Sequence, residues 1–468
     1  MNTIKILLIS VLVYAISACD YKQMDYTGRI VKLMPDSDAL HGWTADSASS
    51  FYGYDNGSIF LKGRSTLYYN GEVHNAQFKN FEILTRIMTE PGAVAGLWFH
   101  SGNASGYQAL INNTPASEEH RKTGSLSAVR NLYKSLAVDE KWFTLYIKVV
   151  DKHITIKVND ILVVDYVEPV EPYRIAENSG MKIAKGSFAF SNYTEKGIRI
   201  CEFDIKPLPD DEVPERTDAI DEQNDAIIKL QQVNFPVIDF HVHLKGWNQH
   251  QALDYSRKNG IFYGIAPNCG IGFPVTSDDD IYRFLDTTKN LSCFLAMQGE
   301  GREWHTTFSR EAAACFDYVF TDAMTFTDHK GRRTRIWIPE EVFIDVSHEK
   351  YMNMLVDRTI EILRNEPIDI YVNPTCLPAE MMPDYDKLWT DEYINKLVRV
   401  LVDKGIALEI NSGRKIPSEK IIKAAKDAGV RFAFGTNNAD SNIGKLEYSI
   451  EMAEKCGITR YDMFFPKK

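Results

Sequence analysis

Residues 237–244 read VIDFHVHL, and this stretch decides the fold of the second half of the chain. Its apolar character predicts a buried strand that ends in polar residues. His241 and His243 are two positions apart, so both imidazoles face the same side of that strand. Such a pair can hold one cation, but two structural histidines at a strand end would give the same pattern. The sequence after residue 244 helps to distinguish a metal-binding pair from a structural pair.

Strands and helices alternate from residue 236 onward. The predicted strands are 237–243, 262–268, 292–299, 317–323, 369–375, 407–412 and 431–437. The predicted helices are 250–260, 278–289, 349–365, 391–405, 418–429 and 443–457. About seven strand–helix units in a row predict a parallel α/β barrel, with its functional site at the carboxyl ends of the strands.

The preceding residues, 27–207, consist instead of short runs with period two or a bias to aromatic and β-branched residues. Turn-like segments separate these runs, and this pattern predicts an antiparallel sandwich or jelly roll. PLPDDEVPERTD at 207–218 is rich in proline and acid, and a helix is predicted at 217–232, so residues 208–235 form a linker. The fold class is therefore two-domain, with an all-β jelly-roll sandwich followed by an α/β barrel at 236–468.

Composition excludes several classes of protein. A chain of 468 residues is too long for one ordinary core, and 44% hydrophobic with 25% charged residues is typical of a water-soluble globular body. The formal net charge of −11 argues against nucleic acid as a partner. Seven cysteines without a CxxC pair indicate neither a zinc ribbon nor a thioredoxin-like site.

The N-terminus has the features of a secretory signal. A charged start, a short apolar run and small residues precede Cys19, as in a bacterial lipobox. We therefore expect a signal peptide at 1–18, lipidation of Cys19 and a tether at 19–26. These features predict a membrane-anchored lipoprotein in the periplasm or at the cell surface, whereas a plain signal peptide cut nearby is the alternative.

Polar residues follow nearly every predicted barrel strand. They are His241, His243, Asn268, Gln298, Glu300, Asp322, Asn373, Glu409, Asn411, Asn437 and Asn438. Strand ends of a parallel barrel meet at one rim, where polar residues indicate function rather than packing. We expect a divalent metal ion, zinc or manganese, held by His241, His243, Glu300, Asp322 and Asn437. Glu300 or Glu409 would be the catalytic group that activates a bound water.

DFHVH at 239–243, GEG at 299–301, LEIN at 408–411 and FGTNN at 434–438 resemble the PHP (polymerase and histidinol phosphatase) family of metal-dependent hydrolases. The resemblance covers roughly 236–460 and implies a seven-stranded barrel with His241, His243 and Glu300 at metal-ligand positions. PNCG at 267–270, Asn373-Pro374 and Asn437 depart from the family pattern. These departures favour a single-metal site, or one that has lost its metal, over a three-metal phosphoesterase centre.

Arginines cluster in the loop after the fourth strand. Arg333 and Arg335 are candidates to bind an anionic group of a substrate, since guanidinium forks match carboxylate or phosphate. A solvated basic loop on an acidic protein is the alternative.

The first half resembles the 3-keto-disaccharide hydrolase domain family through GW at 42–43, GLWFHSG at 96–102, GYQALI at 106–111 and EFDIKPLP at 202–209. The resemblance implies action on sugars oxidised at carbon 3, with calcium or no cofactor. A site for this chemistry needs a base near neutrality and a donor for the enolate oxygen. Candidates on the presumed concave sheet are His100 as a catalytic residue and Tyr107, Gln108 and Asn112 as substrate-binding residues. Gln108 departs from the family, which has an acid there.

Two functions remain open from the sequence. The first is a lipoprotein hydrolase or lyase that acts on glycosides, which the resemblance implies to be 3-keto-glycosides, with a partly degenerate PHP-like barrel. The second is a carbohydrate-binding lipoprotein whose sandwich is not catalytic and whose barrel is a phosphoesterase or inactive. Metal content separates the enzyme from a binding protein with an inactive barrel, since the enzyme interpretation expects about one tightly bound divalent ion per chain. Replacement of His241 and His243 with alanine separates a catalytic sandwich, whose activity on a 3-keto-glycoside would survive, from a catalytic barrel.

Overall fold

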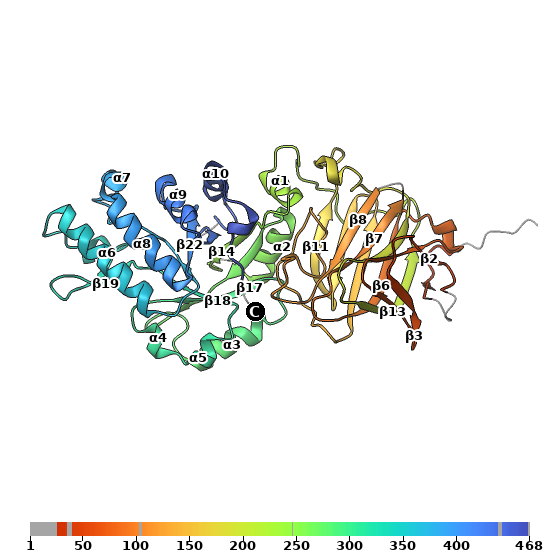
Figure 1. Cartoon of the computed structure of the whole chain (residues 1–468), viewed down its shortest axis with the longest axis horizontal. Coiled ribbons are helices and arrows are strands. Elements are labelled where there is room, and N and C mark those ends of the chain that lie inside the picture. Colours follow the sequence, from red (N-terminus) through yellow and green to blue (C-terminus); the bar gives the residue numbers. More distant parts are fainter. Residues whose placement is uncertain (1–25, 35–39, 103–104, 246, 439–441, 467–468) are drawn as a thin grey trace, which may run out of the picture.

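A computed structural model describes residues 26–34, 40–102, 105–245, 247–438 and 442–466. A β-rich body and an α/β body lie end to end (Figure 1). The predicted signal peptide and the lipidation site Cys19 lie outside the described residues. Within those residues, none of the helices combines the length and apolar character needed to cross a membrane.

The β-rich body is a sandwich of two antiparallel sheets, as predicted. The larger sheet has the order β11 (Ile161–Val167), β10 (His153–Val158), β9 (Phe143–Val150), β6 (Phe81–Thr89), β13 (Ile198–Pro207), β4 (Ser58–Lys62) and β3 (Phe51–Asp55), with β1 (Val31–Lys32) beside β13. The smaller sheet has the order β2 (Trp43–Ala45), β5 (Ser65–Tyr69), β12 (Ser187–Asn192), β7 (Ala95–Gly102) and β8 (Ser105–Ile111).

Alternation along the strands explains how the two sheets pack. In β6, residues 81, 83, 85 and 87 are buried, while Glu82 and Arg86 point outward. Trp43 joins the sheets, with its ring 5.8 Å from Phe190 and 5.6 Å from Phe203. Aromatic pairs at these separations add to the free energy gained by burying apolar area.

The α/β body is a closed parallel barrel of seven strands, which confirms the predicted fold class. Its strands are β14 (Ile238–Val242), β15 (Phe262–Ile265), β17 (Phe294–Gly299), β18 (Tyr318–Thr321), β21 (Ile370–Tyr371), β22 (Ala407–Asn411) and β23 (Phe432–Gly435). The barrel closes because β14 pairs with both β15 and β23. β16 (Asn268–Cys269) adds to β17, and β19 (Thr325–Thr327) pairs with β20 (Arg333–Arg335) in a separate hairpin.

Helices surround the barrel (Figure 1). The longer ones are α2 (Gln249–Asn259), α3 (Asp278–Thr288), α6 (His348–Asn365), α8 (Asp391–Lys404), α9 (Glu419–Asp427) and α10 (Glu447–Lys455). Single-turn helices are α4 (Trp304–Thr307), α5 (Arg310–Ala313) and α7 (Tyr385–Leu388). Short 3-10 helices are η1 (Val73–Ala76), η2 (Ala176–Asn178), η3 (Pro339–Glu341), η4 (Met382–Asp384) and η5 (Arg460–Asp462).

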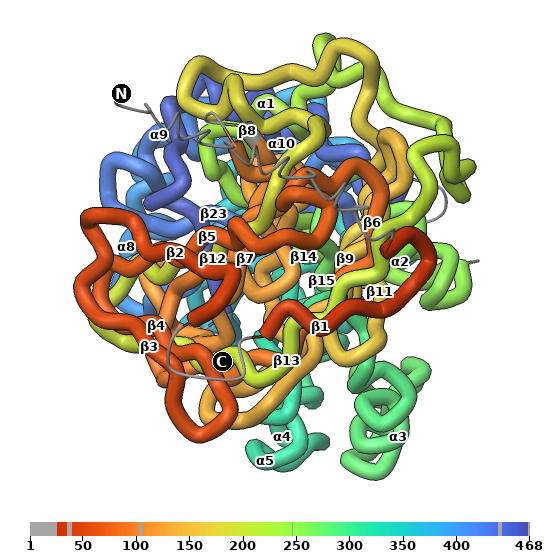
Figure 2. The backbone as a smooth tube through the Cα atoms, turned by 90° about the vertical axis from the view of Figure 1, so that its right-hand side faces the viewer, coloured from red at the N-terminus to blue at the C-terminus, as the bar shows by residue number. Residues whose placement is uncertain are grey.

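One apolar cluster is continuous from the sandwich into the interior of the barrel. The ring of Tyr133, from the sandwich, lies 5.7 Å from that of Phe262 on β15. Its hydroxyl also accepts a hydrogen bond from the Val237 amide at 3.4 Å, just before β14. The barrel therefore rests on the sandwich with its amino-terminal end, and its carboxyl-terminal end stays open. Figure 2 looks along this stack from the sandwich side.

The helix in the linker is shorter than predicted. The helix expected at 217–232 begins only at Ala226, where the Asp225 side chain accepts a hydrogen bond from the Ile227 amide, and it ends at Gln232 as α1. The residues before it are held on the sandwich: Arg216 pairs with Asp165 at 2.8 Å, and Glu222 pairs with Arg174 at 2.7 Å. These contacts hold the segment extended, and helix propensity does not decide its conformation.

A buried arginine connects the two bodies through hydrogen bonds. Arg130 of the sandwich donates hydrogen bonds to the carbonyls of Arg257 at 3.1 Å and Lys258 at 3.0 Å. These carbonyls belong to the last turn of α2, which needs partners there and favours a cation. The guanidinium also lies 5.0 Å from the centre of the Tyr166 ring. The orientation of α2 is therefore set by the sandwich.

Candidate functional site

A pocket of about 250 Å³ opens at the carboxyl ends of the barrel strands. Its walls are mostly polar and come from almost every strand end. They comprise His243, Lys245, Asn268, Phe273, Gln298, Glu300, Asp322, Met324, Trp337, Asn373, Arg414 and Asn437. The strand ends therefore meet where the sequence pattern predicted, and we call this pocket the barrel mouth.

His241 lies beneath the barrel mouth and is fully buried. Its Nδ1 is 2.7 Å from Glu409 Oε1, and its Nε2 is 3.2 Å from Gln298 Oε1. Burial alone lowers the pKa of His241, but the Glu409 carboxylate outweighs it and raises the pKa above its ordinary value. In its cationic form the ring donates two hydrogen bonds, from Nδ1 to Glu409 Oε1 and from Nε2 to Gln298 Oε1. These two bonds set the orientation of the imidazole.

His243 has a different environment although it is only two residues away. Its Nδ1 lies 2.8 Å from the Ala266 carbonyl, and a carbonyl can only accept, so Nδ1 carries the proton and Nε2 is the acceptor nitrogen. Burial, with a contribution from the charge on His241, lowers the pKa of His243 to about 3. The two imidazoles therefore differ in charge preference: Glu409 favours the cationic form of His241, whereas burial favours the neutral form of His243.

Glu300 is the acid that faces the barrel mouth. Its Oε1 accepts hydrogen bonds from Asn268 Nδ2 at 2.5 Å and from Gln298 Nε2 at 3.0 Å. Burial, and then the nearby Asp322, raise the pKa of Glu300 to about 7. Gln298 thus links Glu300 to His241, and the carboxyl group exchanges its proton readily near neutrality. We call Glu409, His241, Gln298 and Glu300 the mouth cluster.

Amide side chains occupy much of the remaining rim. Asn437 donates to Asn373 Oδ1 at 2.9 Å, and Asn411 donates to the same oxygen at 3.2 Å. Asn373 in turn lies 3.4 Å from Asp322 Oδ2. Asn373 and Asn437 both have positive φ, of 45° and 43°, a conformation that asparagine tolerates better than most residues. The rim therefore presents neutral donors and acceptors, which suit hydroxyl groups.

The expected metal site is only partly assembled. Glu409 contacts His241 directly, but Gln298 separates Glu300 from His241. Among the residues that the structure describes, no group of three or more His, Cys, Asp or Glu side chains is placed to hold a metal ion. The zinc or manganese ion at His241, His243, Glu300, Asp322 and Asn437 therefore stays a prediction.

The cations at the barrel mouth are not the arginines that the sequence suggested. Arg335 is engaged with Glu341 at 2.7 Å, Arg333 is exposed, and neither lines the pocket. Arg414 and Lys245 line it instead. Both follow barrel strands by a few residues, so the rule that located the acids would also have located these cations.

In the sandwich, the placement expected for His100 and Tyr107 on an open sheet is wrong. His100 has no exposed surface, and its Nε2 lies 2.8 Å from the Lys79 carbonyl. The pairing of β7 shifts between Phe99 and Gly102, and His100 has a φ of 53°. This bulge breaks the alternation that would have turned His100 outward beside Trp98.

Tyr107 belongs to a buried polar network that we call the sandwich cluster: Tyr107, Tyr166, Glu168, Arg174 and Glu222. Tyr107 donates to Glu168 at 2.5 Å, and Arg174 donates to Tyr107 at 2.7 Å. Arg174 also bonds to Tyr166 at 3.0 Å and pairs with Glu222 at 2.7 Å. Its members are mutually paired and enclosed, which identifies a structural role.

Gln108 and Asn112 have separate roles. Gln108 faces outward, accepts from Ser127 at 3.0 Å and contacts the Tyr193 hydroxyl. Asn112 is fully buried and donates to the carbonyls of Glu119 and Arg121, both at 2.7 Å, so it shapes a loop. Of the four sandwich candidates, only Gln108 lies on the outer face of the smaller sheet.

Aromatic side chains accompany Gln108 on that outer face. Tyr68, Ala189, Trp98 and Gln108 form one row of cross-strand partners over four strands. Trp98 donates to the Tyr193 hydroxyl at 3.0 Å, and Tyr68 and Tyr193 are 43% and 41% exposed. The exposed rings of Tyr68 and Tyr193 can contact a ligand that has both apolar and hydroxyl-bearing faces.

Residues 30–203 match the sequence model of the 3-keto-alpha-glucoside-1,2-lyase-like domain, so the match covers the sandwich and does not extend to the barrel. The resemblance of the barrel to the PHP family stays a prediction. No curated protein sequence matches the chain.

Two solved structures illustrate what the chain is similar to. A putative glycosyl hydrolase from Parabacteroides distasonis is 16% identical over 36% of this chain and 89% of its own, with a TM-score of 0.31. The carbohydrate-binding module CBM66 from Bacillus subtilis is 16% identical over 36% of this chain and 96% of its own, with a TM-score of 0.27.

Proposed function

We propose that the protein is a carbohydrate-acting enzyme, a hydrolase or lyase of 3-keto-glycosides whose reaction takes place at the barrel mouth. One observation carries the proposal: Glu300 faces the pocket, held by Asn268 and Gln298 and connected through Gln298 to His241 and Glu409. The match of the sandwich to a 3-keto-alpha-glucoside-1,2-lyase-like domain supports the choice of substrate class.

The chemistry follows from the ketone. A carbonyl at carbon 3 acidifies the proton on carbon 2, and Glu300 is the base that removes it. The resulting enolate expels the group at carbon 1, so the C1–O bond breaks and its electron pair leaves with the oxygen. That oxygen takes the proton that Glu300 acquired, and addition of water to carbon 1 completes hydrolysis. Arg414 and Lys245 at the pocket wall are donors for the enolate oxygen.

The size and lining of the pocket agree with a sugar. Its volume of about 250 Å³ is near the lower end of ligand pockets, which span roughly 300–1,000 Å³, so it suits a single ring. Asn268, Asn373 and Asn437 offer donors and acceptors for hydroxyl groups, and Trp337, 39% exposed, offers an apolar face. Such a mixture orients a polyhydroxylated ligand without a net charge of its own.

The test follows proton removal directly. A 3-keto-α-glucoside is incubated with the protein in heavy water, and exchange at carbon 2 and release of the aglycone are both recorded. Glu300→Gln should lower both rates by at least about 100-fold, because the variant has no base at this position. Glu303→Gln is the control, since Glu303 is exposed and outside the pocket wall.

Retention of exchange in Glu300→Gln would contradict the proposal and assign the reaction to the sandwich or to no part of the chain. An unoxidised α-glucoside serves as a second substrate. It has no acidified proton at carbon 2, so the proposal expects no exchange with either the wild type or the variants.

Carbohydrate binding without catalysis is the second candidate function. The outer face of the smaller sheet favours it, because Tyr68 and Tyr193 are exposed there and the half-buried Trp98 bonds to the Tyr193 hydroxyl. Trp98→Ala would then abolish glycan binding, and Glu300→Gln would have no effect on any property of the protein. Under the enzyme proposal, Trp98→Ala leaves exchange at carbon 2 intact.

The proposal includes attachment to a membrane through a lipid on Cys19, at the periplasmic face or the cell surface. Its support is the sequence pattern before Cys19. Cys19→Ser should move the full chain from the membrane fraction to the soluble fraction on cell fractionation. Equal membrane retention of Cys19→Ser and the wild type would contradict it.

A further inference from the structure

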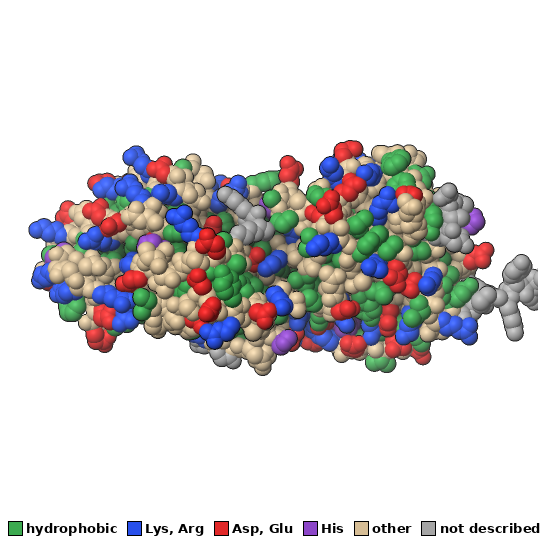
Figure 3. Space-filling model, turned by 90° about the horizontal axis from the view of Figure 1, so that it is seen from below, with side chains coloured by type: hydrophobic (Ala, Val, Ile, Leu, Met, Phe, Trp, Pro, Cys, Tyr) green, Lys and Arg blue, Asp and Glu red, His purple; other side chains and the backbone are tan. Residues whose placement is uncertain are grey.

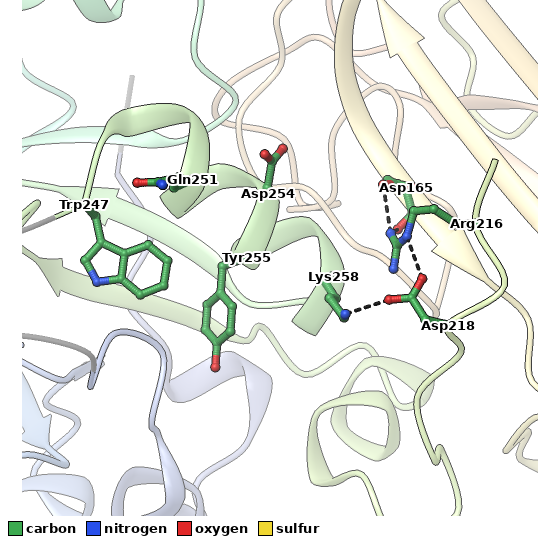
Figure 4. A pocket seen from close by; sticks show the side chains of 8 residues that line it. All are labelled: Asp165, Arg216, Asp218, Trp247, Gln251, Asp254, Tyr255 and Lys258. Atoms are coloured by element: carbon green, nitrogen blue, oxygen red, sulfur yellow. Dashed lines mark hydrogen bonds and ion pairs between the residues drawn. The ribbon is translucent and has the colours of Figure 1, made fainter.

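A second, larger hollow lies where the sandwich, the linker and helix α2 meet. Its volume is about 640 Å³, and it shares no lining residue with the barrel mouth. Figure 4 shows Trp247 and Tyr255 on one side and the linker residues Arg216 and Asp218 on the other. We call it the junction groove. None of the functional residues predicted from the sequence belongs to it.

The charges of the junction groove are paired among themselves. Arg216 bonds to Asp165 at 2.8 Å and to Asp218 at 2.9 Å, and Lys258 bonds to Asp218 at 2.7 Å. Asp254 pairs with Arg257 on the same helix. Basic and acidic side chains are also interspersed on the face of the molecule shown in Figure 3. Because its acidic and basic side chains pair with one another, the groove offers no unpaired charge to attract an ionic ligand, and we expect a neutral one.

Two aromatic rings provide the apolar part of the junction groove. The rings of Trp247 and Tyr255 are 5.5 Å apart at an angle of 52°. Tyr255 is 37% exposed, whereas Trp247 packs partly against the core between barrel and helices. Gln251, one turn before Tyr255 on α2, adds an amide that can donate and accept. The rings are therefore held in place while part of their surface stays accessible.

The junction groove also has a defined direction relative to the barrel mouth. Helix α2 begins at Gln249, shortly after β14, and ends at Asn259 against Arg130 of the sandwich. Lys245, which lines the barrel mouth, precedes Trp247 by two residues. The groove thus follows α2 from the rim of the barrel toward the sandwich.

We propose that the junction groove binds a neutral oligosaccharide. One sugar ring lies against Trp247 and Tyr255, and hydroxyl groups of the oligosaccharide form hydrogen bonds to Gln251, Asp254 and Asp218. Sugars present apolar C–H faces and a rim of hydroxyls, and the groove offers aromatic faces beside paired carboxylates and an amide. The inference rests on the proposed function only in taking the ligand to be a carbohydrate.

Binding of maltohexaose and of cellohexaose to the full chain, measured by calorimetry, tests the proposal. The wild type should bind at least one of them, and Trp247→Ala and Tyr255→Ala should each weaken that binding roughly tenfold or more. Tyr282→Ala is the matched control, because Tyr282 is 46% exposed on α3 and does not line the groove. Binding should not depend on salt, since the ligand is neutral.

Further variants separate this proposal from the proposed function. Glu300→Gln should bind the hexaose like the wild type even if it has lost exchange at carbon 2, and Trp98→Ala should also bind like the wild type. Loss of exchange in Glu300→Gln together with unchanged binding by Trp247→Ala and Tyr255→Ala would overturn the proposed binding site in the junction groove and leave the proposed function at the barrel mouth standing. Absence of binding to both hexaoses, loss of binding in Trp98→Ala only, or loss of binding at high salt would overturn it as well.

Discussion

Two polar clusters are buried in this protein, and they differ in what their charges face. In the sandwich cluster, Arg174 and Glu222 have side chains that are 2% and 0% exposed, and each is paired with the other. In the mouth cluster, His241 and Glu409 form a comparable buried pair, but the series continues through Gln298 to Glu300 at the pocket wall. The first cluster is enclosed by protein, whereas the second ends at a pocket.

The comparison teaches that burial and unusual residues do not by themselves identify a functional site. A buried charged pair is costly to break, so a closed network stabilises one arrangement of the chain. A network with one titratable end in a pocket can transfer a proton to a ligand. We therefore expect substitutions in the sandwich cluster to change stability and substitutions in the mouth cluster to change reactivity.

Removing the central cation of the sandwich cluster should have the largest effect on stability. Arg174→Met leaves Glu222 without its cationic partner and removes donors to Tyr107 and Tyr166. The free energy of unfolding should fall by about 3–5 kcal/mol, as for other broken buried pairs. Chemical denaturation measures this change.

The control is Lys185→Met, because Lys185 and its partner Asp210 are both largely exposed at the surface. It should unfold like the wild type. The double variant Arg174→Met with Glu222→Gln should recover part of the lost stability, since it no longer buries an unpaired carboxylate. Equal stability of Arg174→Met and the wild type would show that the cluster is not enclosed.

The buried His100 should make the protein sensitive to acid. Burial lowers the pKa of His100 to about 4, below its value of about 6.5 in the unfolded chain. The unfolded state therefore binds the proton more readily, and the contribution of neutral His100 is complete above about pH 6.5 and is lost as the pH falls toward 4. This loss is on the order of 3 kcal/mol.

Unfolding titrations of the wild type and His100→Gln over this pH range measure the effect. The variant should lose less free energy of unfolding on acidification, because glutamine does not titrate there. Parallel pH profiles for the two proteins would show that His100 is not the buried neutral residue that the packing indicates.

The contact between the two bodies should contribute less than the sandwich cluster. Arg130→Met removes hydrogen bonds to the carbonyls at the end of α2. We expect a loss of about 2 kcal/mol, the value of charge-assisted hydrogen bonds to backbone acceptors. Hydrogen exchange should also show faster opening of residues 249–259, whereas uniform protection across the barrel would contradict this role.

The smallest effect is expected at the arginines of the β19–β20 hairpin. Arg335 pairs with Glu341 away from the barrel mouth, so Arg335→Ala should change neither stability nor turnover measurably. Arg414→Ala, at the pocket wall, should lower kcat/KM for a 3-keto-glycoside. A loss of turnover in Arg335→Ala equal to that in Arg414→Ala would return the anion-binding role to the hairpin.

Sequence patterns predicted the architecture well. Period-two alternation located the sandwich strands, and the repeated strand–helix units located all seven barrel strands. The rule that strand ends of a parallel barrel meet at one rim also gathered Glu300, Asp322, Asn373 and Asn437 around one pocket. These features depend on local periodicity, which a sequence carries directly.

Other features depended on contacts between distant residues. A bulge turned His100 inward, and no spacing in the sequence announces a bulge. Tyr107 and Gln108 are adjacent on β8, so they point to opposite faces, and Gln108 is on the outer side of the sheet but is buried beneath Ser127. Gln298 separates Glu300 from His241, which depends on how far each side chain extends. The junction groove likewise depends on how the two bodies dock.

The central claim is tested most directly by comparing one glutamate from each cluster. Turnover of a 3-keto-α-glucoside, per folded molecule, is measured for Glu300→Gln and Glu168→Gln beside their free energies of unfolding. The account predicts that Glu300→Gln loses turnover and keeps its stability, and that Glu168→Gln loses stability and keeps its turnover. Full turnover in Glu300→Gln, or its loss in folded Glu168→Gln, would contradict the account.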